Sequence, residues 1–387
     1  GSGEEAAGKA GGRGSRSKGD DAGEDKKAKG RDWNFGAGAR PAAVSNALKT
    51  GLGSLDEEGC WHEAAAELEP LPAAARAGDL EDGEEEELRL RAEKLEEAAA
   101  KAFNDRLAKR SSAESRWLQL SRTSGTTSDR VAALTLLVQE SAVANIQSLD
   151  ALLKFVTKSS GGKDVVGKAI DALRELFSRS LLPERPLLLL ADRPLAAIPN
   201  SRLGNRHLLY WHIEDAIKRR YSIFVEALDE RSRDNVEFLK EKALKAAYEL
   251  LAGKPEAEAR LLALVVNKLG DPSRKLASKS GYLLLCLLDQ HPAMKPVVVR
   301  EVERFVFRPN LADRARYYAV VFLNQIALSH RTEQGGAALA RQLLDIYFTI
   351  FRLVLAGKAG AQAEATARAA AAKEKEGSSD EKQKQKQ

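Results

Sequence analysis

Histidines and cysteines are the residues of this 387-residue chain that are best suited to metal binding or nucleophilic catalysis. Cys60 and Cys286 lie far apart in the sequence, which argues against a disulfide framework and a four-thiolate zinc site. His207 and His212 miss the three- or four-residue spacing that places two side chains on one helix face. The other histidines are His62, His291 and His330. We therefore expect no catalytic residue, no metal and no cofactor.

Glycine-rich stretches could instead cradle phosphate groups, as they do in nucleotide-binding loops. The glycines of residues 11–14 lie in a low-complexity leader, without the strand and helix that such a loop needs. Residues 159–163 (Ser-Ser-Gly-Gly-Lys) also lack a preceding strand, so we interpret them as a connection between helices. Glu214 and Asp215 lie close to Lys218, so ion pairing explains them better than acid–base catalysis. The sequence therefore predicts neither an enzyme nor a small-molecule substrate.

Basic side chains in the second half are the strongest candidates for a binding surface. The chain has 61 Lys and Arg against 56 Asp and Glu, a formal net charge of +5, which excludes a polybasic coat but allows a local basic face. Arg300, Arg304 and Arg308 follow one another at four-residue steps, so a helix would present them on one face. The candidate RNA- or partner-binding residues are Lys218, Arg219, Arg220, Arg274, Lys275, Lys279, Arg300, Arg304 and Arg308. These residues could bind phosphates, and ion pairing with Asp or Glu of a neighbouring repeat is the alternative.

Aromatic side chains occur in two groups at helical spacing. The first group is Tyr210, Trp211, Tyr221 and Phe224, and the second is Tyr317, Tyr318 and Phe322. Because aliphatic residues surround both groups, we expect core residues rather than platforms for stacking nucleic-acid bases.

Two tryptophans lie in a region that has few other residues for a core. Trp33 and Trp61 interrupt polar sequence, and we interpret them as a docking motif. Residues 58–83 form the corresponding Trp-containing docking segment. A partner and the chain's own helices are equally good candidates for the surface that the tryptophans contact.

Helical periodicity dominates the sequence after Gly125. Segments of about 12 to 20 residues end at Gly, Pro or Asp/Asn pairs, and no convincing strand interrupts them. Asp234 and Asp271 each begin a predicted helix, and a third unit begins near Pro309, so a unit of about 37 residues repeats. Paired helices of this period are typical of HEAT and armadillo repeats, which bury their apolar faces by stacking. We therefore predict an all-α fold, a HEAT/armadillo-like α-solenoid with disordered N- and C-terminal tails.

Composition divides the chain into five predicted regions. They are a disordered mixed-charge leader (1–57), the docking segment (58–83), a charged helix (84–123), the α-helical-repeat domain (128–356) and an Ala/Lys/Glu/Gln-rich tail (357–387). The leader lacks the apolar core of a signal peptide, and no stretch is apolar enough to span a membrane, so we expect no membrane contact. Because Gly1 stands in place of an initiator methionine, we expect a fragment of a longer protein or a truncated gene model.

Four sequence blocks match a known protein family in their residues and in their order. They are residues 129–141 (Asp-Arg-Val-Ala-Ala-Leu-Thr-Leu-Leu-Val-Gln-Glu-Ser), 266–280 (Val-Asn-Lys-Leu-Gly-Asp-Pro-Ser-Arg-Lys-Leu-Ala-Ser-Lys-Ser), 297–309 (Val-Val-Val-Arg-Glu-Val-Glu-Arg-Phe-Val-Phe-Arg-Pro) and 322–330 (Phe-Leu-Asn-Gln-Ile-Ala-Leu-Ser-His). Together with Cys60-Trp61 before a Glu-rich helix, they resemble the CCAAT-binding factor family, which includes the nucleolar-complex proteins. The resemblance covers roughly residues 58–355.

This resemblance implies a helical-repeat scaffold in ribosome biogenesis, located in the nucleus and nucleolus, that assists early assembly of the large ribosomal subunit. It also implies a heterodimer with a second nucleolar-complex protein, and contacts with precursor ribosomal RNA and ribosomal proteins. Two alternatives remain open. One is a CCAAT-box DNA-binding transcriptional regulator, and the other is a pure protein–protein HEAT scaffold.

Overall fold

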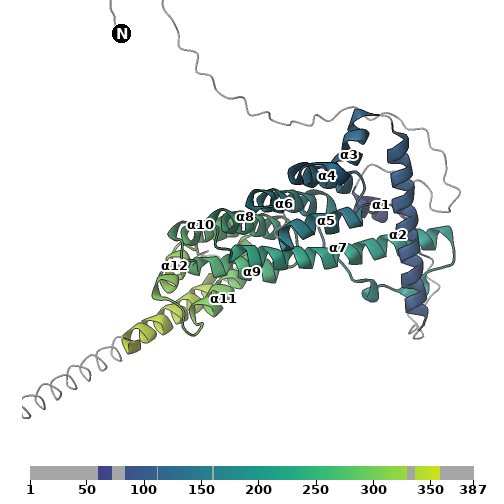
Figure 1. Ribbon diagram of the computed structural model, residues 1–387. Helices are drawn as coiled ribbons and strands as arrows, with labels where there is room; N and C mark the ends of the chain where they lie inside the picture. Colours follow the sequence, from purple (N-terminus) through teal and green to yellow (C-terminus); the bar gives the residue numbers. More distant parts are fainter. Residues whose placement is uncertain (1–59, 72–82, 111, 159–160, 329–335, 358–387) are drawn as a thin grey trace, which may run out of the picture. The chain divides into compact units, whose positions relative to one another are not determined.

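Two rows of helices pack against each other along the chain (Figure 1). The computed structural model describes residues 60–71, 83–110, 112–158, 161–328 and 336–357. The first row consists of α4 (Thr127–Glu140), α6 (Lys163–Leu176), α8 (Glu237–Gly253), α10 (Arg274–Gln290) and α12 (Asp313–Leu323). The second row consists of α5 (Ile146–Thr157), α7 (Arg202–Ser232), α9 (Glu258–Asn267) and α11 (Lys295–Val306). Each first-row helix contacts the next one in its row, while α5 contacts both α4 and α6, and α9 contacts both α8 and α10.

This arrangement confirms the predicted all-α solenoid. No β-strand occurs within the described ranges. The first-row helices α8, α10 and α12 begin at Glu237, Arg274 and Asp313, which reproduces the repeat of about 37 residues. A further helix over residues 336–357 follows α12. The tails predicted to be disordered, 1–57 and 357–387, lie outside the described residues except for residue 357.

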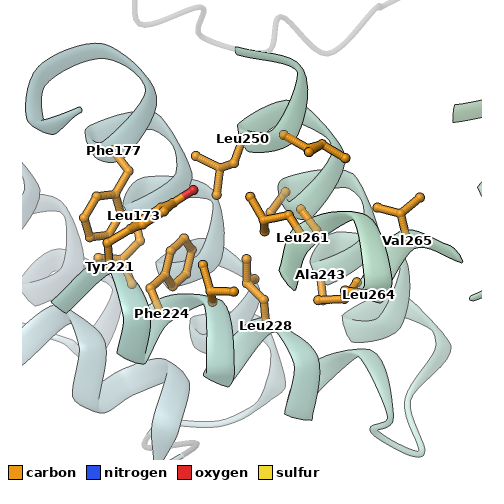
Figure 2. Close-up of a cluster of buried hydrophobic side chains, with 14 of the residues drawn as sticks. Leu173, Phe177, Tyr221, Phe224, Leu228, Ala243, Leu250, Leu261, Leu264 and Val265 are labelled. Atoms are coloured by element: carbon orange, nitrogen blue, oxygen red, sulfur yellow. The ribbon is translucent and has the colours of Figure 1, made fainter. Parts of the chain in front are cut away.

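A continuous apolar seam fills the space between the two rows. Figure 2 shows a part of it, built by the buried side chains of Leu173, Phe177, Tyr221, Phe224, Leu228, Ala243, Leu250, Leu261, Leu264 and Val265. On α7, Tyr221, Phe224 and Leu228 recur at three- and four-residue steps, so one face of the helix is apolar. Each fully buried Leu or Phe contributes about 1.5–3 kcal/mol, which offsets the entropy lost on ordering the chain. The outward faces of the helices carry polar and charged side chains, together with exposed large apolar residues such as Phe238, Tyr282 and Tyr317.

In the part of the chain that the structure describes, three helices precede the rows: α1 (Trp61–Ala66), α2 (Glu84–Lys109) and α3 (Ala113–Ser124). Helix α2 packs against α7, where Arg91 donates from Nε to Oδ1 of Asn205 at 2.8 Å. The sequence predicts one charged helix over 84–123, whereas the structure has two helices, α2 and α3, over residues 84–124. The second helix starts anew because the Ser112 hydroxyl caps it, accepting a hydrogen bond from the Ser115 backbone N–H at 3.1 Å.

An irregular segment connects α6 to α7 and contains the short helices η1 (Phe177–Leu181), η2 (Leu190–Asp192) and η3 (Leu195–Ala197). Buried carboxylates replace the hydrogen bonds that a regular helix would supply. The backbone N–H of Leu187 donates to Oε2 of Glu256 at 2.7 Å. The backbone N–H of Leu188 donates to Oε1 of Glu214 at 2.9 Å. These contacts fix the connecting segment, which we call the α6–α7 segment, against the helical rows.

Candidate RNA- or partner-binding surface

The predicted stripe of three arginines begins on α11. This helix buries Val298, Val302 and other apolar side chains, so Arg300 and Arg304 face outward. The Arg304 side chain is 70% exposed and lies 3.4 Å from Glu301 on the same helix. Arg300 is exposed and has no hydrogen bond or ion pair with any residue that the structure describes. Both guanidinium groups therefore remain accessible to an anionic partner.

Arg308 completes the stripe just beyond the end of α11. Its Nη1 donates to Oδ1 of Asn267 at 2.6 Å, and its guanidinium carbon lies 5.4 Å from the centre of the Phe305 ring. These contacts orient an exposed side chain without neutralising its charge, because neither partner is acidic. The stripe thus presents three positive charges.

The three consecutive basic residues 218–220 of α7 are occupied by acidic partners. Arg220 donates two hydrogen bonds of 2.7 Å to the carboxylate of Asp150 on α5. Lys218 lies 3.1 Å from Glu256, one of the carboxylates that hold the α6–α7 segment. Lys218 and Arg220 thus pair with carboxylates of the loop between α8 and α9 and of α5, as the alternative to phosphate binding expects.

The acidic pair Glu214 and Asp215 has the ion-pairing role that its sequence context predicts. Asp215 pairs with Arg219 one turn along α7 at 2.8 Å. Glu214 is buried and binds Arg185 at 2.5 Å, together with Arg193, so its partners come from the α6–α7 segment instead of α7. Burial alone would raise the pKa of Glu214. Hydrogen bonds from Arg185 and a backbone N–H outweigh burial, and the pKa lies below its ordinary value.

On α10, two of the three predicted basic residues share one carboxylate. Lys275 and Lys279 bind Glu241 of α8, and these hydrogen bonds, that of Lys279 first, lower the pKa of Glu241. The hydrogen bond to Glu241 in turn raises the pKa of Lys275. Arg274 is exposed at the start of α10, and no described residue forms a hydrogen bond or ion pair with it.

The nine predicted basic residues therefore divide into two sets. The first set pairs with carboxylates in ways that connect or support helices: Lys218, Arg219, Arg220, Lys275 and Lys279. The second set is exposed and lacks an acidic partner on another helix: Arg274, Arg300, Arg304 and Arg308. The second set can bind an external anion without breaking an ion pair to another helix.

Trp61 packs on the chain's own helices. Its side chain is buried, and its Nε1 donates to the backbone oxygen of Leu181 at 2.9 Å. The sequence leaves open whether Trp61 contacts a partner or the chain's own helices, and the structure shows that it contacts the chain's own helices. Trp33 lies outside the described residues.

The aromatic residues expected in the core are not all buried. Tyr221, Phe224 and Phe322 are buried as predicted. The prediction is wrong for Tyr317, which is 64% exposed, because helical spacing defines a face but does not show whether another helix covers it. Sequence reasoning also missed Tyr282, which is 65% exposed on α10. No sequence pattern around Tyr282 indicates that its ring is exposed.

Titratable side chains do not converge on a metal site: in the parts of the chain that the structure describes, no group of three or more His, Cys, Asp or Glu residues could hold an ion. The histidines form isolated contacts, such as that of His212 with Glu96 at 3.0 Å. His330 lies outside the described residues. No helix among the described residues is both long and apolar enough to cross a membrane.

Comparison with known proteins finds six relatives, of which three are described here. The chain is 40% identical to the CCAAT/enhancer-binding protein zeta of Homo sapiens over 273 residues, which is 69% of this chain and 25% of that protein. It is 35% identical to the ribosome biogenesis protein NOC1 of Chaetomium thermophilum over 256 residues (62% of this chain, 24% of that protein). It is 32% identical to nucleolar complex protein 1 of Drosophila melanogaster over 292 residues (73% and 24%). The chain spans 22% to 27% of the length of the curated relatives that it matches. No family model matches it.

Proposed function

We propose that this chain, whose relatives confirm its resemblance to the CCAAT-binding factor and nucleolar-complex family, is a helical-repeat scaffold in ribosome biogenesis. It acts in the nucleolus on early precursors of the large ribosomal subunit. Its helical-repeat domain, residues 128–356, contacts precursor ribosomal RNA and ribosomal proteins. A second nucleolar-complex protein is its partner in a heterodimer. The relatives' names support the nucleolar role in ribosome biogenesis, and the solenoid supports a role that depends on surface contacts.

The observation that carries the RNA contact is the contrast between the two sets of basic residues. Solenoids use inter-repeat ion pairs for support, and Arg220 with Asp150 is such a pair. Arg300 and Arg308 have no carboxylate partner among the described residues, and Arg304 pairs only within α11. An exposed row of arginines on one helix can neutralise phosphates and release their counterions.

The experiment that tests this proposal reverses the arginine stripe. The triple variant Arg300→Glu, Arg304→Glu and Arg308→Glu should retain the helical circular-dichroism spectrum, because all three side chains are exposed. Its affinity for precursor ribosomal RNA should fall, and the slope of log affinity against log salt should become shallower by up to about three, one for each lost phosphate contact.

A control with the same change in net charge separates local binding from general electrostatics. Arg89→Glu, Arg179→Glu and Lys245→Glu alter residues on α2, η1 and α8 whose side chains are 39%, 77% and 57% exposed, and whose ion pairs join positions three or four residues apart. If the control weakens binding as much as the stripe variant does, or if the stripe variant binds normally, the stripe has no specific role in RNA binding.

A pure protein–protein scaffold is the second candidate, and the pairing of five predicted basic residues favours it. Partner proteins that remain bound to the chain after nuclease treatment, with no RNA affinity in the purified chain, would establish this candidate in place of the first.

A further inference from the structure

A groove with a volume of about 540 Å³ lies between α10 and α12 of the first row. Helix α10 contributes Arg274, Ser278 and Tyr282 to it, at steps of four residues that place all three on one face. Helix α12 contributes Arg314 and Tyr317, among other residues. The ion pairs expected from the sequence do not explain why aromatic and basic side chains lie together in this groove.

The tyrosines of the groove expose large ring surfaces. Tyr282 and Tyr317 are 65% and 64% exposed, and buried apolar residues such as Phe322 line the same groove. Tyr318 is half-buried, and its ring meets that of Tyr317 at 70° with the centroids 5.6 Å apart. Exposed aromatic rings that pack against neighbouring side chains can stack on a flat ligand such as a nucleic-acid base.

Positive charge is concentrated at one end of the groove. Arg274 is the first residue of α10 and has no hydrogen bond or ion pair with a described residue. Arg314, in the first turn of α12, donates to the backbone oxygen of Pro272 at 2.7 Å, so both arginines lie where the two helices begin. Among the described residues that line the groove, none is Asp or Glu. The two guanidinium groups therefore favour an anionic ligand.

We propose that this groove binds single-stranded RNA, with a phosphate at Arg274 and Arg314 and bases stacked on Tyr282 and Tyr317. This inference rests on the RNA contact of the proposed function and gives it a second site, separate from the arginine stripe of α11. Bases of an RNA duplex are already stacked on each other, so only an unpaired segment can use the tyrosine rings. Ser278 and Gln325 provide polar groups within the same lining for base edges or the 2′-hydroxyl.

The test measures binding of a short fluorescent oligouridylate to the full chain and to groove variants. Tyr282→Ala and Tyr317→Ala should each weaken binding by about five-fold or more, since stacking on one aromatic side chain contributes about 1–3 kcal/mol. Tyr282→Phe and Tyr317→Phe keep the ring and should bind like the wild type. Arg274→Glu should weaken binding and make its salt slope shallower by about one. A duplex RNA of the same length should show little sensitivity to the tyrosine variants.

Phe348→Ala provides the matched control, because Phe348 is 62% exposed on the helix over residues 336–357 and does not line the groove. Wild-type-like affinity in both Tyr→Ala variants would overturn the groove proposal, while leaving the proposed function intact if the wild-type chain binds RNA. If the wild-type chain does not bind RNA at all, both the groove proposal and the RNA contact of the proposed function fail. Saturable binding of an acidic peptide that the Tyr→Ala variants abolish, with unchanged oligouridylate affinity, would assign the groove to a protein ligand and overturn the proposal.

Discussion

Arg220 of α7 holds Asp150 of α5 through two hydrogen bonds of 2.7 Å, one from Nε and one from Nη2. The two residues are 70 positions apart in the sequence, and their side chains are 20% and 38% exposed. This two-point contact uses both carboxylate oxygens and the flat edge of the guanidinium group. Arg220 therefore serves the interface between two second-row helices.

We expect Arg220→Ala to lower stability and to leave RNA affinity unchanged. The variant removes two charge-assisted hydrogen bonds and leaves Asp150 without its partner, which should cost about 1–3 kcal/mol in the free energy of unfolding. Urea denaturation followed by circular dichroism measures this change. Arg219→Ala is the control, because Arg219 is 62% exposed and its pair with Asp215 should contribute less than about 1 kcal/mol. Normal stability combined with lost RNA affinity in Arg220→Ala would contradict this assignment.

Trp61 should behave as a core residue of the folded chain. Trp61→Phe removes the donor to the Leu181 carbonyl and should cost about 1–3 kcal/mol, because a buried acceptor is left unsatisfied. Trp61→Ala also opens a cavity and should cost about 3–5 kcal/mol. Thermal and urea unfolding of both variants check these values. Trp117→Phe, at a residue 40% exposed, should change little. Unchanged stability of Trp61→Ala would instead indicate that Trp61 binds a partner and does not stabilise the fold.

Glu214 should make the stability of the chain depend on pH at the acidic end. Because its pKa in the folded state lies below the value in the unfolded chain, its ionised form stabilises the fold above a pH of about 4.3. This contribution should be lost as the pH falls through the folded-state pKa. Glu214→Gln removes the charge that Arg185 and Arg193 surround, which should cost about 3 kcal/mol at neutral pH.

Unfolding in urea at a series of pH values separates this effect from general acid sensitivity. The difference between wild type and Glu214→Gln should be largest near neutral pH and should shrink below pH 4.3 or so. A difference that stays constant from pH 7 to the acidic end would show that the ionisation of Glu214 does not stabilise the fold.

The repeat architecture was predictable because apolar periodicity is a local property. Asp234 and Asp271 mark the starts of α8 and α10 to within three residues, since capping and turn residues lie next to the helices they limit. The roles of the basic residues depend on contacts that no local pattern encodes. The sequence spacing of Arg300 and Arg304 correctly placed them on an exposed face of α11, but it could not show that Arg220 meets Asp150.

The exposure of the aromatic residues could not be predicted from a local sequence pattern either. Tyr221 and Tyr317 both have helical spacing and aliphatic neighbours, yet Tyr221 is covered by Phe177 of η1 whereas Tyr317 borders a groove. Coverage is decided by the position of other helices, which the sequence of one helix does not specify.

The proposed role in assembly of the large ribosomal subunit is tested most directly by the RNA that the chain binds in cells. A tagged chain, ultraviolet cross-linked in living cells and purified under denaturing conditions, should yield fragments enriched in precursors of the large-subunit ribosomal RNA. The variant reversed at Arg300, Arg304 and Arg308 should recover much less of this RNA from an equal amount of protein. Recovery of unrelated RNAs alone, or of the same precursor fragments in equal yield from the reversed variant, would contradict the account.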